Sequence, residues 1–120
     1  MEKKKICKIR EIYRAIAALE SLFEKQYDLN INEAMLLCHL KDHADVTSGE
    51  IAESLQLTCS NASKVIVSVE KKKLVRRRLD KNDKRQMHFS LTKMGEERLG
   101  RMNCDSIELP ELLRSITAEQ

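Results

Sequence analysis

Two helix-start signals follow one another closely in residues 47–69, and this pair limits what the chain can fold into more than any other feature. Thr47-Ser48-Gly49-Glu50 has the T-x-x-E pattern of a capping box, in which side chains satisfy the free amides of the first helical turn. Thr58 is a second good N-cap. The spacing predicts a helix of about nine residues, a tight turn and a second helix, which is the order of a helix-turn-helix unit.

The second of these helices has an apolar and a polar face. Its buried face is predicted to consist of the residues at i, i+3, i+4 and i+7, namely Ala62, Val65, Ile66 and Val69. The opposite face presents short polar or cationic side chains, which are Ser60, Asn61, Ser63, Lys64, Ser68 and Lys71. Such side chains can reach phosphates or base edges from a helix in the major groove of DNA. An ordinary solvated helix surface is the alternative interpretation.

Positive charge is concentrated at and behind this helix. The whole chain carries 22 Lys+Arg and 19 Asp+Glu, a net charge of +3, yet residues 64–85 contain ten basic and three acidic residues. This window therefore carries +7 and the rest of the chain −4. A local cationic block is typical of a phosphate-binding surface, because attraction to a polyanion is screened within about 8–10 Å at physiological salt. Charge alone is equally compatible with a solvated surface.

Composition narrows the classes of partner and activity. The chain has no Trp, two Tyr and two Phe, so it lacks the aromatic platforms on which proteins stack single-stranded bases. Double-stranded DNA remains the predicted nucleic-acid partner. The sequence has no G-x-S-x-G, no glycine-rich phosphate loop and no H-E-x-x-H motif. We therefore predict neither an enzyme nor a bound cofactor.

The hydrophobic period changes after residue 74. Residues 87–91 alternate apolar and polar side chains, and Leu74-Val75 opens an earlier extended segment. Residues 80–84 between them are rich in turn formers. The pattern predicts a two-stranded hairpin with a cationic tip, placed directly after the recognition helix as a wing.

Helices are predicted on both sides of this core. Residues 3–27 contain no Gly or Pro and repeat apolar side chains every three or four positions. A helix of this length measures about 35 Å, more than one small domain can cover, so part of its apolar stripe is predicted to pack on a second subunit. Another helix is predicted from Asn30 or Asn32 to about His43. Two more are predicted after the wing, over residues 92–102 and over residues 109–116 with Pro110 at its start.

A chain of 120 residues has the length of one domain. No apolar run approaches the roughly 20 residues that cross a bilayer, and no signal-peptide core is present, which predicts a soluble, cytoplasmic protein without a membrane partner. The four cysteines lie far apart without a C-x-x-C motif, so we interpret them as reduced thiols. Cys38 is predicted to lie in the core.

Five short segments together resemble the winged helix-turn-helix core of the MarR family of bacterial transcriptional regulators. They are Gly49-Glu50-Ile51-Ala52 with Leu55, Ser60 to Lys64, Leu74 to Arg77, Asp83-Lys84-Arg85, and Leu91-Thr92-Lys93-Met94-Gly95. The resemblance spans about residues 29–99, and its most specific part is the wing, where "DKR", five residues and "LT..G" have the family's spacing. It implies a mainly α fold with a small β-hairpin wing: a winged helix-turn-helix core over residues 29–95 and dimerisation helices over residues 1–28 and 96–120.

The resemblance also implies a function and residue roles. Members of the family are homodimers that bind palindromic operators, usually as repressors, and many release DNA when a phenolic ligand, an oxidant or a metal binds. By position, the major-groove residues would be Ser60, Asn61, Ser63, Lys64 and Ser68. Lys84 or Arg85 would enter the minor groove, and Asp83 would hold a neighbouring arginine. Arg76 and Arg77 would contact the DNA backbone, while Lys73 stands where the family commonly has a residue with left-handed backbone.

Other interpretations compete with this one. Cys7, close to several lysines, and Cys59, in the first turn of the recognition helix, are candidate redox sensors, but an inert thiol is the favoured interpretation of each. His39 and His43 have a spacing that can hold a transition metal, and His88 is a third imidazole. The sequence places no Cys or carboxylate to complete a tetrahedral site, so no metal is predicted. The main alternative function is a winged-helix module that binds an acidic protein surface.

Overall fold

The computed structural model describes residues 1–104 and 112–114 of the chain. The described residues fall into two compact units, one containing residues 1–30 and the other residues 31–104. The second unit includes the helix-turn-helix, the wing and the helix that follows the wing. The helix predicted over residues 109–116 lies largely outside the described residues. Within this range only residues 112–114 are described, and they are helical.

The first unit contains one long helix, α1 (Lys3–Tyr27), as the apolar repeat predicts. The helix ends at Asp28, whose backbone is left-handed (φ 55°) and whose amide donates to the Glu24 carbonyl. Part of its apolar stripe is open to solvent in the single chain, at Ile6, Ile9, Tyr13 and Ile16. An unpaired stripe of this kind is what a second subunit would cover.

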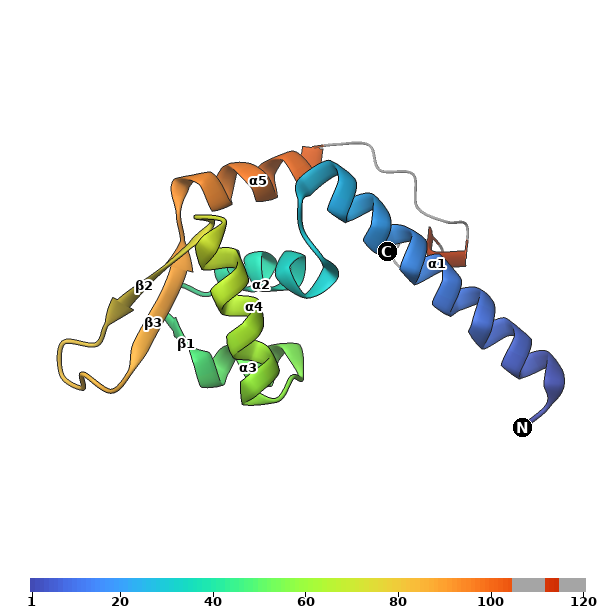
Figure 1. Cartoon of the computed structure of the whole chain (residues 1–120), viewed down its shortest axis with the longest axis horizontal. Helices are drawn as coiled ribbons and strands as arrows, with labels where there is room; N and C mark the ends of the chain where they lie inside the picture. Colours follow the sequence, from blue (N-terminus) through green and yellow to red (C-terminus); the bar gives the residue numbers. More distant parts are fainter. Residues whose placement is uncertain (105–111, 115–120) are drawn as a thin grey trace. The chain divides into compact units, whose positions relative to one another are not determined.

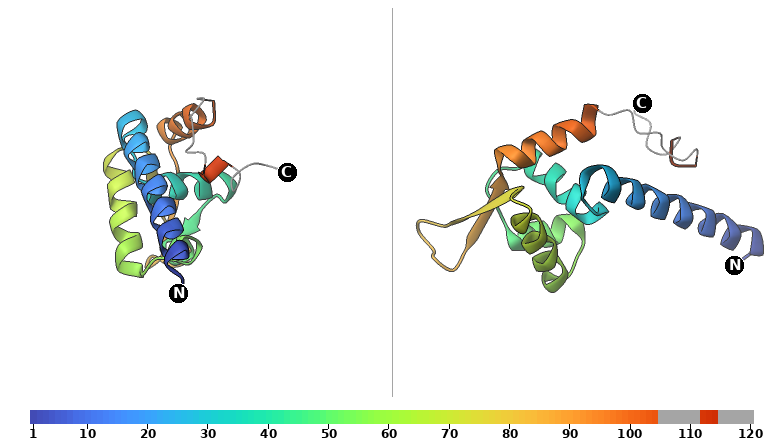
Figure 2. Two further views of the ribbon diagram at one scale, coloured as in Figure 1. Left: turned by 90° about the vertical axis from the view of Figure 1, so that its right-hand side faces the viewer. Right: turned by 45° about the horizontal axis from the view of Figure 1, so that its top comes forward.

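The second unit has the element order that the sequence predicts, with one addition. Its elements are α2 (Ile31–Asp42), β1 (Val46–Thr47), α3 (Ser48–Leu55), α4 (Cys59–Lys71), β2 (Val75–Leu79), β3 (Met87–Leu91) and α5 (Lys93–Cys104). Figure 1 shows the hairpin of β2 and β3 beside α4, and the right-hand view of Figure 2 shows it extending beyond the helices of this unit. We call residues 75–91 the wing. The fully buried side chains of the core include Leu36, Leu37, Ile51 and Leu74.

The two predicted caps start the two helices of the helix-turn-helix. The Thr47 hydroxyl oxygen accepts the Glu50 amide at 3.2 Å, and that of Thr58 accepts the Asn61 amide at 3.1 Å. Between them, α3 ends at Gln56 with left-handed backbone (φ 54°), and the Leu57 amide donates to the Ala52 carbonyl. This pair of local signals sets the direction of α4 relative to α3.

The sheet has three strands in the order β1-β3-β2, all antiparallel. The hairpin pairs Val75 with Leu91 and Leu79 with Met87, as the alternation predicts. The prediction of a two-stranded sheet is incomplete, because β1 pairs Val46 with Phe89 on the other edge of β3. A strand of two residues is too short to show alternation, so no period revealed it.

Two predictions about burial need correction. Val65 is only half-buried, whereas Ala62, Ile66 and Val69 are buried as predicted. Cys38 is exposed on α2, so its assignment to the core is wrong. Among the described residues, no helix is long and apolar enough to cross a membrane.

Candidate nucleic-acid interface

The exposed face of α4 consists of small polar groups and one lysine. Ser60, Asn61, Ser63 and Lys64 are all exposed, as is Cys59 in the first turn. Val67 is 42% exposed and adds an apolar side chain to this surface that the polar pattern did not predict. These side chains are short, which lets the helix backbone approach a flat-walled groove closely.

Ser68 differs from the other serines of α4. Its hydroxyl donates to Oε2 of Glu33 at 2.7 Å, and the Glu33 side chain on α2 is only 2% exposed. Lys72 Nζ lies 3.0 and 2.9 Å from the two oxygens of the same carboxylate. These hydrogen bonds compensate for burying the charge of Glu33. Ser68 therefore ties α4 to α2, and its hydroxyl proton is engaged within the protein.

Arg76 and Arg77 alternate to opposite sides of β2. The Arg77 guanidinium donates from Nε and Nη2 to the Glu70 carboxylate at 2.7 and 2.5 Å, and it lies 5.6 Å from the centroid of the Phe89 ring. Hydrogen bonding to Glu70 raises the pKa of Arg77. Arg76 is exposed, with Nε 3.4 Å from the Ser90 hydroxyl. The two arginines thus present their charges on different surfaces.

Asp83 organises the wing tip. Its Oδ1 accepts both the backbone amide of Arg85, at 3.0 Å, and the Arg85 Nε, at 3.2 Å. The Arg85 side chain is nonetheless 91% exposed. Lys84 beside it is exposed as well. Of the two cations suggested for the minor groove, Arg85 is the one whose direction a neighbouring carboxylate restricts.

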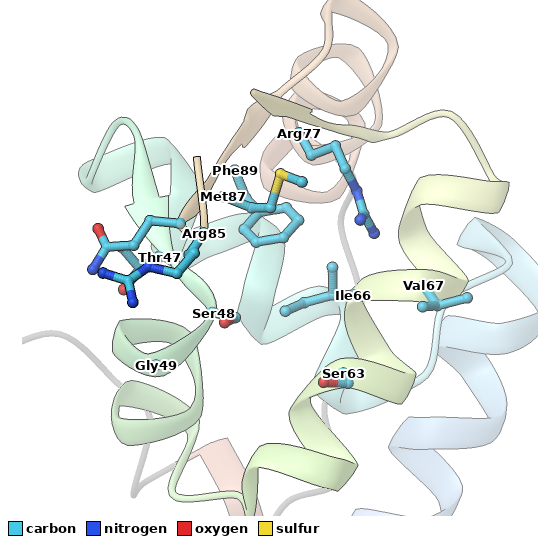
Figure 3. A pocket seen from close by; sticks show the side chains of 11 residues that line it. Thr47, Ser48, Gly49, Ser63, Ile66, Val67, Arg77, Arg85, Met87 and Phe89 are labelled. Atoms are coloured by element: carbon cyan, nitrogen blue, oxygen red, sulfur yellow. The ribbon is translucent and has the colours of Figure 1, made fainter. Parts of the chain in front are cut away.

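A hollow of about 480 Å³ separates α4 from the wing. It is lined by the start of α3, by Ser63, Ile66 and Val67 of α4, and by wing residues that include Arg77 and Arg85. Figure 3 shows the two arginine side chains on opposite sides of this hollow. Ser63 of α4 and two cations of the wing, Arg77 and Arg85, therefore border the same hollow.

A sequence-family comparison decides what kind of domain carries this surface. The model of the MarR family matches residues 29–87, which include α2, the helix-turn-helix and the wing as far as the start of β3. The chain belongs to the MarR family. A comparison with curated proteins gives no match.

Solved structures agree with the MarR-family fold. The chain is 24% identical to MepR of Staphylococcus aureus in a MepR–DNA complex, covering 86% of this chain and 75% of that one with a TM-score of 0.75. A MepR mutant bound to an oligodeoxyribonucleotide is 25% identical, with coverage of 85% and 75% and a TM-score of 0.68. Another MarR family transcription regulator is 20% identical, with coverage of 85% and 68% and a TM-score of 0.75.

The two neighbouring histidines at the end of α2 contact each other, and His39 also contacts α3. The His39 and His43 rings stack with centroids 4.6 Å apart, and His39 Nδ1 lies 3.1 Å from the Ser54 hydroxyl. No group of three metal-binding side chains occurs in residues 1–104 and 112–114. Cys7 is half-buried on α1 and Cys59 is exposed on α4, and both are free thiols.

Three polar contacts beside this surface were not predicted from the sequence. Glu33 holds Ser68 and Lys72, Glu70 holds Arg77, and His88 contacts Asp80 at the base of the wing tip. Each has a partner distant in sequence or on another element, so local spacing carried no signal for these pairs.

Proposed function

We propose that this MarR-family protein is a transcriptional regulator that binds double-stranded DNA, with α4 in the major groove and the wing in the adjacent minor groove. The observation that carries the proposal is the hollow that Ser63, on the small polar face of α4, shares with the wing residue Arg85, which Asp83 holds. The fold similarity to MepR in its DNA complexes supports the same arrangement.

Within this arrangement, base readout by α4 is modest. The groove-facing set is Ser60, Asn61, Ser63 and Lys64, and it contains no arginine to pair bidentately with guanine. Asn61 is the residue in this set able to pair with an adenine edge. Phosphate contacts and groove shape therefore supply most of the binding free energy.

In the wing, Arg85 is the proposed minor-groove residue and Lys84 a supporting cation. A narrow A·T-rich minor groove attracts cations, and Asp83 restricts the directions that the Arg85 guanidinium samples. Arg76, exposed on the outer strand β2, is proposed to contact phosphates. Arg77 is proposed to contact the DNA backbone. Its ion pair with Glu70 holds the guanidinium at the edge of the hollow beside α4.

The functional unit is proposed to be a homodimer that represses transcription from a palindromic operator. The exposed stripe of Ile6, Ile9, Tyr13 and Ile16 on α1 supports this assembly, because a second copy would remove these side chains from water. Two symmetry-related wings and recognition helices would then match the two half-sites of the operator.

The test is salt-dependent binding to a duplex carrying the upstream region of the protein's own gene, beside a duplex of random sequence. If each subunit neutralises four to five phosphates, the slope of log K against log salt is about −7 to −9 for the dimer. The double substitution Lys84→Ala plus Arg85→Ala removes four charges per dimer, so it should make this slope less steep by up to about 4. The control Lys25→Ala plus Lys41→Ala removes the same charge from α1 and α2 and should leave the slope nearly unchanged.

Failure to bind either duplex at low salt would reject the proposal. It would instead favour the alternative of a winged-helix module that recognises an acidic protein surface.

A further inference from the structure

His88 joins two separate parts of the second unit. It lies on the central strand β3, with Thr47 of β1 and Arg78 of β2 as its strand partners. Its ring is half-buried, with Nδ1 2.8 Å from the carbonyl oxygen of Asp45 and Nε2 2.8 Å from Oδ2 of Asp80. One end of the ring therefore contacts the loop before β1, and the other contacts the residue at which the wing tip begins.

The chemistry of the two partners determines the protonation state of the ring. A backbone carbonyl and an ionised carboxylate both accept hydrogen bonds and donate none. Both ring nitrogens must therefore carry hydrogen, which makes His88 an imidazolium in this arrangement. A neutral imidazole has a single N–H and must give up one of the two contacts.

The surrounding charges favour this cation on balance. The Asp80 carboxylate faces Nε2 directly and favours the imidazolium. The charge of Arg78 disfavours it, but the Arg78 guanidinium lies 3.5 Å from the Asp45 carboxylate, which partly offsets that charge. The hydrogen bonds to Asp45 and Asp80 raise the pKa of His88 above its ordinary value, and Arg78 and desolvation oppose them.

Asp80 transmits the position of His88 to the wing tip. Its other oxygen, Oδ1, accepts the amides of Asn82 at 2.8 Å and Asp83 at 3.2 Å. Asp83 in turn holds Arg85. A continuous series of contacts therefore runs from the Asp45 loop through His88 to the exposed arginine.

We propose that His88 is a positioning residue for the wing, and that its imidazolium form fixes the turn that presents Lys84 and Arg85 to DNA. This inference rests on the proposed function and adds a regulation to it. When His88 loses its proton, one contact is released, so the order of the wing tip and the affinity for duplex DNA fall together as pH rises.

The first experiment needs no DNA. Nitrogen-15 NMR of the His88 ring across about pH 5.5 to 9 reports which ring nitrogens carry hydrogen. We expect both nitrogens of His88 to stay protonated above the pH at which an ordinary histidine loses its proton, about 6.5. We also expect protection of the Asn82 and Asp83 amides from exchange to fall as His88 titrates. A neutral His88 near pH 6 with unchanged amide protection would overturn the proposal.

Asp80→Asn is the sharpest variant. An asparagine amide can donate to Nε2 while its oxygen still accepts the amides of Asn82 and Asp83, so a neutral His88 with hydrogen on Nδ1 keeps both contacts. We expect this variant to retain wing protection at high pH and to lose its pH dependence. His88→Gln should show low protection at every pH, and circular dichroism confirms that the variants are folded. If protection of the Asn82 and Asp83 amides still depended strongly on pH in Asp80→Asn, the mechanism would be overturned.

The second experiment measures binding of a short random-sequence duplex at fixed low salt. Between about pH 6 and pH 8.5 the Kd of the wild-type protein should rise about fivefold or more, within the usual range for two coupled equilibria. The change should be absent in Asp80→Asn and retained in the control His39→Gln plus His43→Gln. Wild-type affinity that is flat over this range would overturn the coupling to DNA. Absence of binding at every pH would reject the proposed function, while the NMR result would still decide whether His88 positions the wing.

Discussion

A β-carbon added to Gly95 would overlap the carbonyl oxygen of Leu74, so the first turn of α5 lies directly against the end of α4. The same junction is joined by hydrogen bonds, because the Thr92 hydroxyl donates to the Lys73 carbonyl at 2.7 Å and accepts the Gly95 amide at 3.0 Å. The "LT..G" segment therefore fixes the helix after the wing to the end of the recognition helix.

Gly95→Ala should lower the free energy of unfolding by about 2–3 kcal/mol, because backbone atoms rather than a flexible side chain must move to admit the methyl group. Gly100→Ala is the matched control on the same helix. Nothing lies within 4 Å of its added β-carbon, so it should stabilise by about 0.5–1 kcal/mol. Urea unfolding measures both, and equal effects of the two substitutions would contradict this account.

Lys73→Gly should stabilise the protein by up to about 1 kcal/mol. Lys73 has φ 64°, a left-handed backbone that glycine adopts without the steric cost of a β-carbon. Lys71→Gly removes the same charge two residues earlier, inside α4, and should destabilise by about 1 kcal/mol. Thermal unfolding of the two variants compares them directly, and stabilisation by Lys71→Gly or destabilisation by Lys73→Gly would be inconsistent with the backbone argument.

Glu33→Gln should destabilise the protein by roughly 1–3 kcal/mol, because Ser68 and Lys72 lose a charged acceptor in a buried position. Lys72 is partly exposed and can turn its ammonium to water, which moderates the loss. Lys72→Met alone leaves the buried carboxylate without its cation and should also destabilise. The double variant should cost less than the two single changes combined, as a double-mutant cycle in urea would show. Strict additivity would mean that the pair is not energetically coupled.

Asp83→Ala should weaken DNA binding even though it removes a negative charge next to a polyanion. The reason is that Asp83 holds Arg85, so the guanidinium must be ordered on binding when this carboxylate is missing. Glu97→Ala, an exposed acid on α5, is the control and should leave affinity unchanged or slightly raise it. Fluorescence anisotropy with the same duplex compares the variants. Tighter binding by Asp83→Ala would show that charge rather than orientation dominates at the wing tip.

The His88–Asp80 pair should stabilise the folded protein over a defined pH range. The folded-state pKa of His88 is raised, so its contribution is fully present below the unfolded value of about 6.5 and is lost as pH rises through the raised pKa. The pKa of Asp80 is lowered, first by the Asn82 amide and then by His88, so its contribution is present above about 3.9 and is lost as pH falls through the lowered pKa. The stability difference between wild type and His88→Gln should therefore be greatest between about pH 4 and 6.5. A difference independent of pH would rule out the ionic contribution.

The sequence by itself determined the elements whose signals are local. Thr47 and Thr58 cap their helices through amides three residues away, and the alternation in residues 87–91 predicted strand β3, at whose centre Phe89 is buried. The charged block, the two caps and the wing spacing were sufficient to identify the family. The contact between Asp83 and Arg85 is also local, because the two residues are only two positions apart in the chain.

Only the tertiary structure decided which polar residues face outward and which hold the elements together. The sequence places Ser68 on the same polar face as the exposed Ser60 and Ser63, yet its partner Glu33 lies 35 residues earlier in the chain. The contact of His88 with the Asp45 carbonyl spans 43 residues, and strand β1 exists through its pairing with β3. Periodicity and capping describe interactions within a few residues of one another. The partner of a buried charge depends instead on which elements pack side by side, and that is fixed when the whole unit folds.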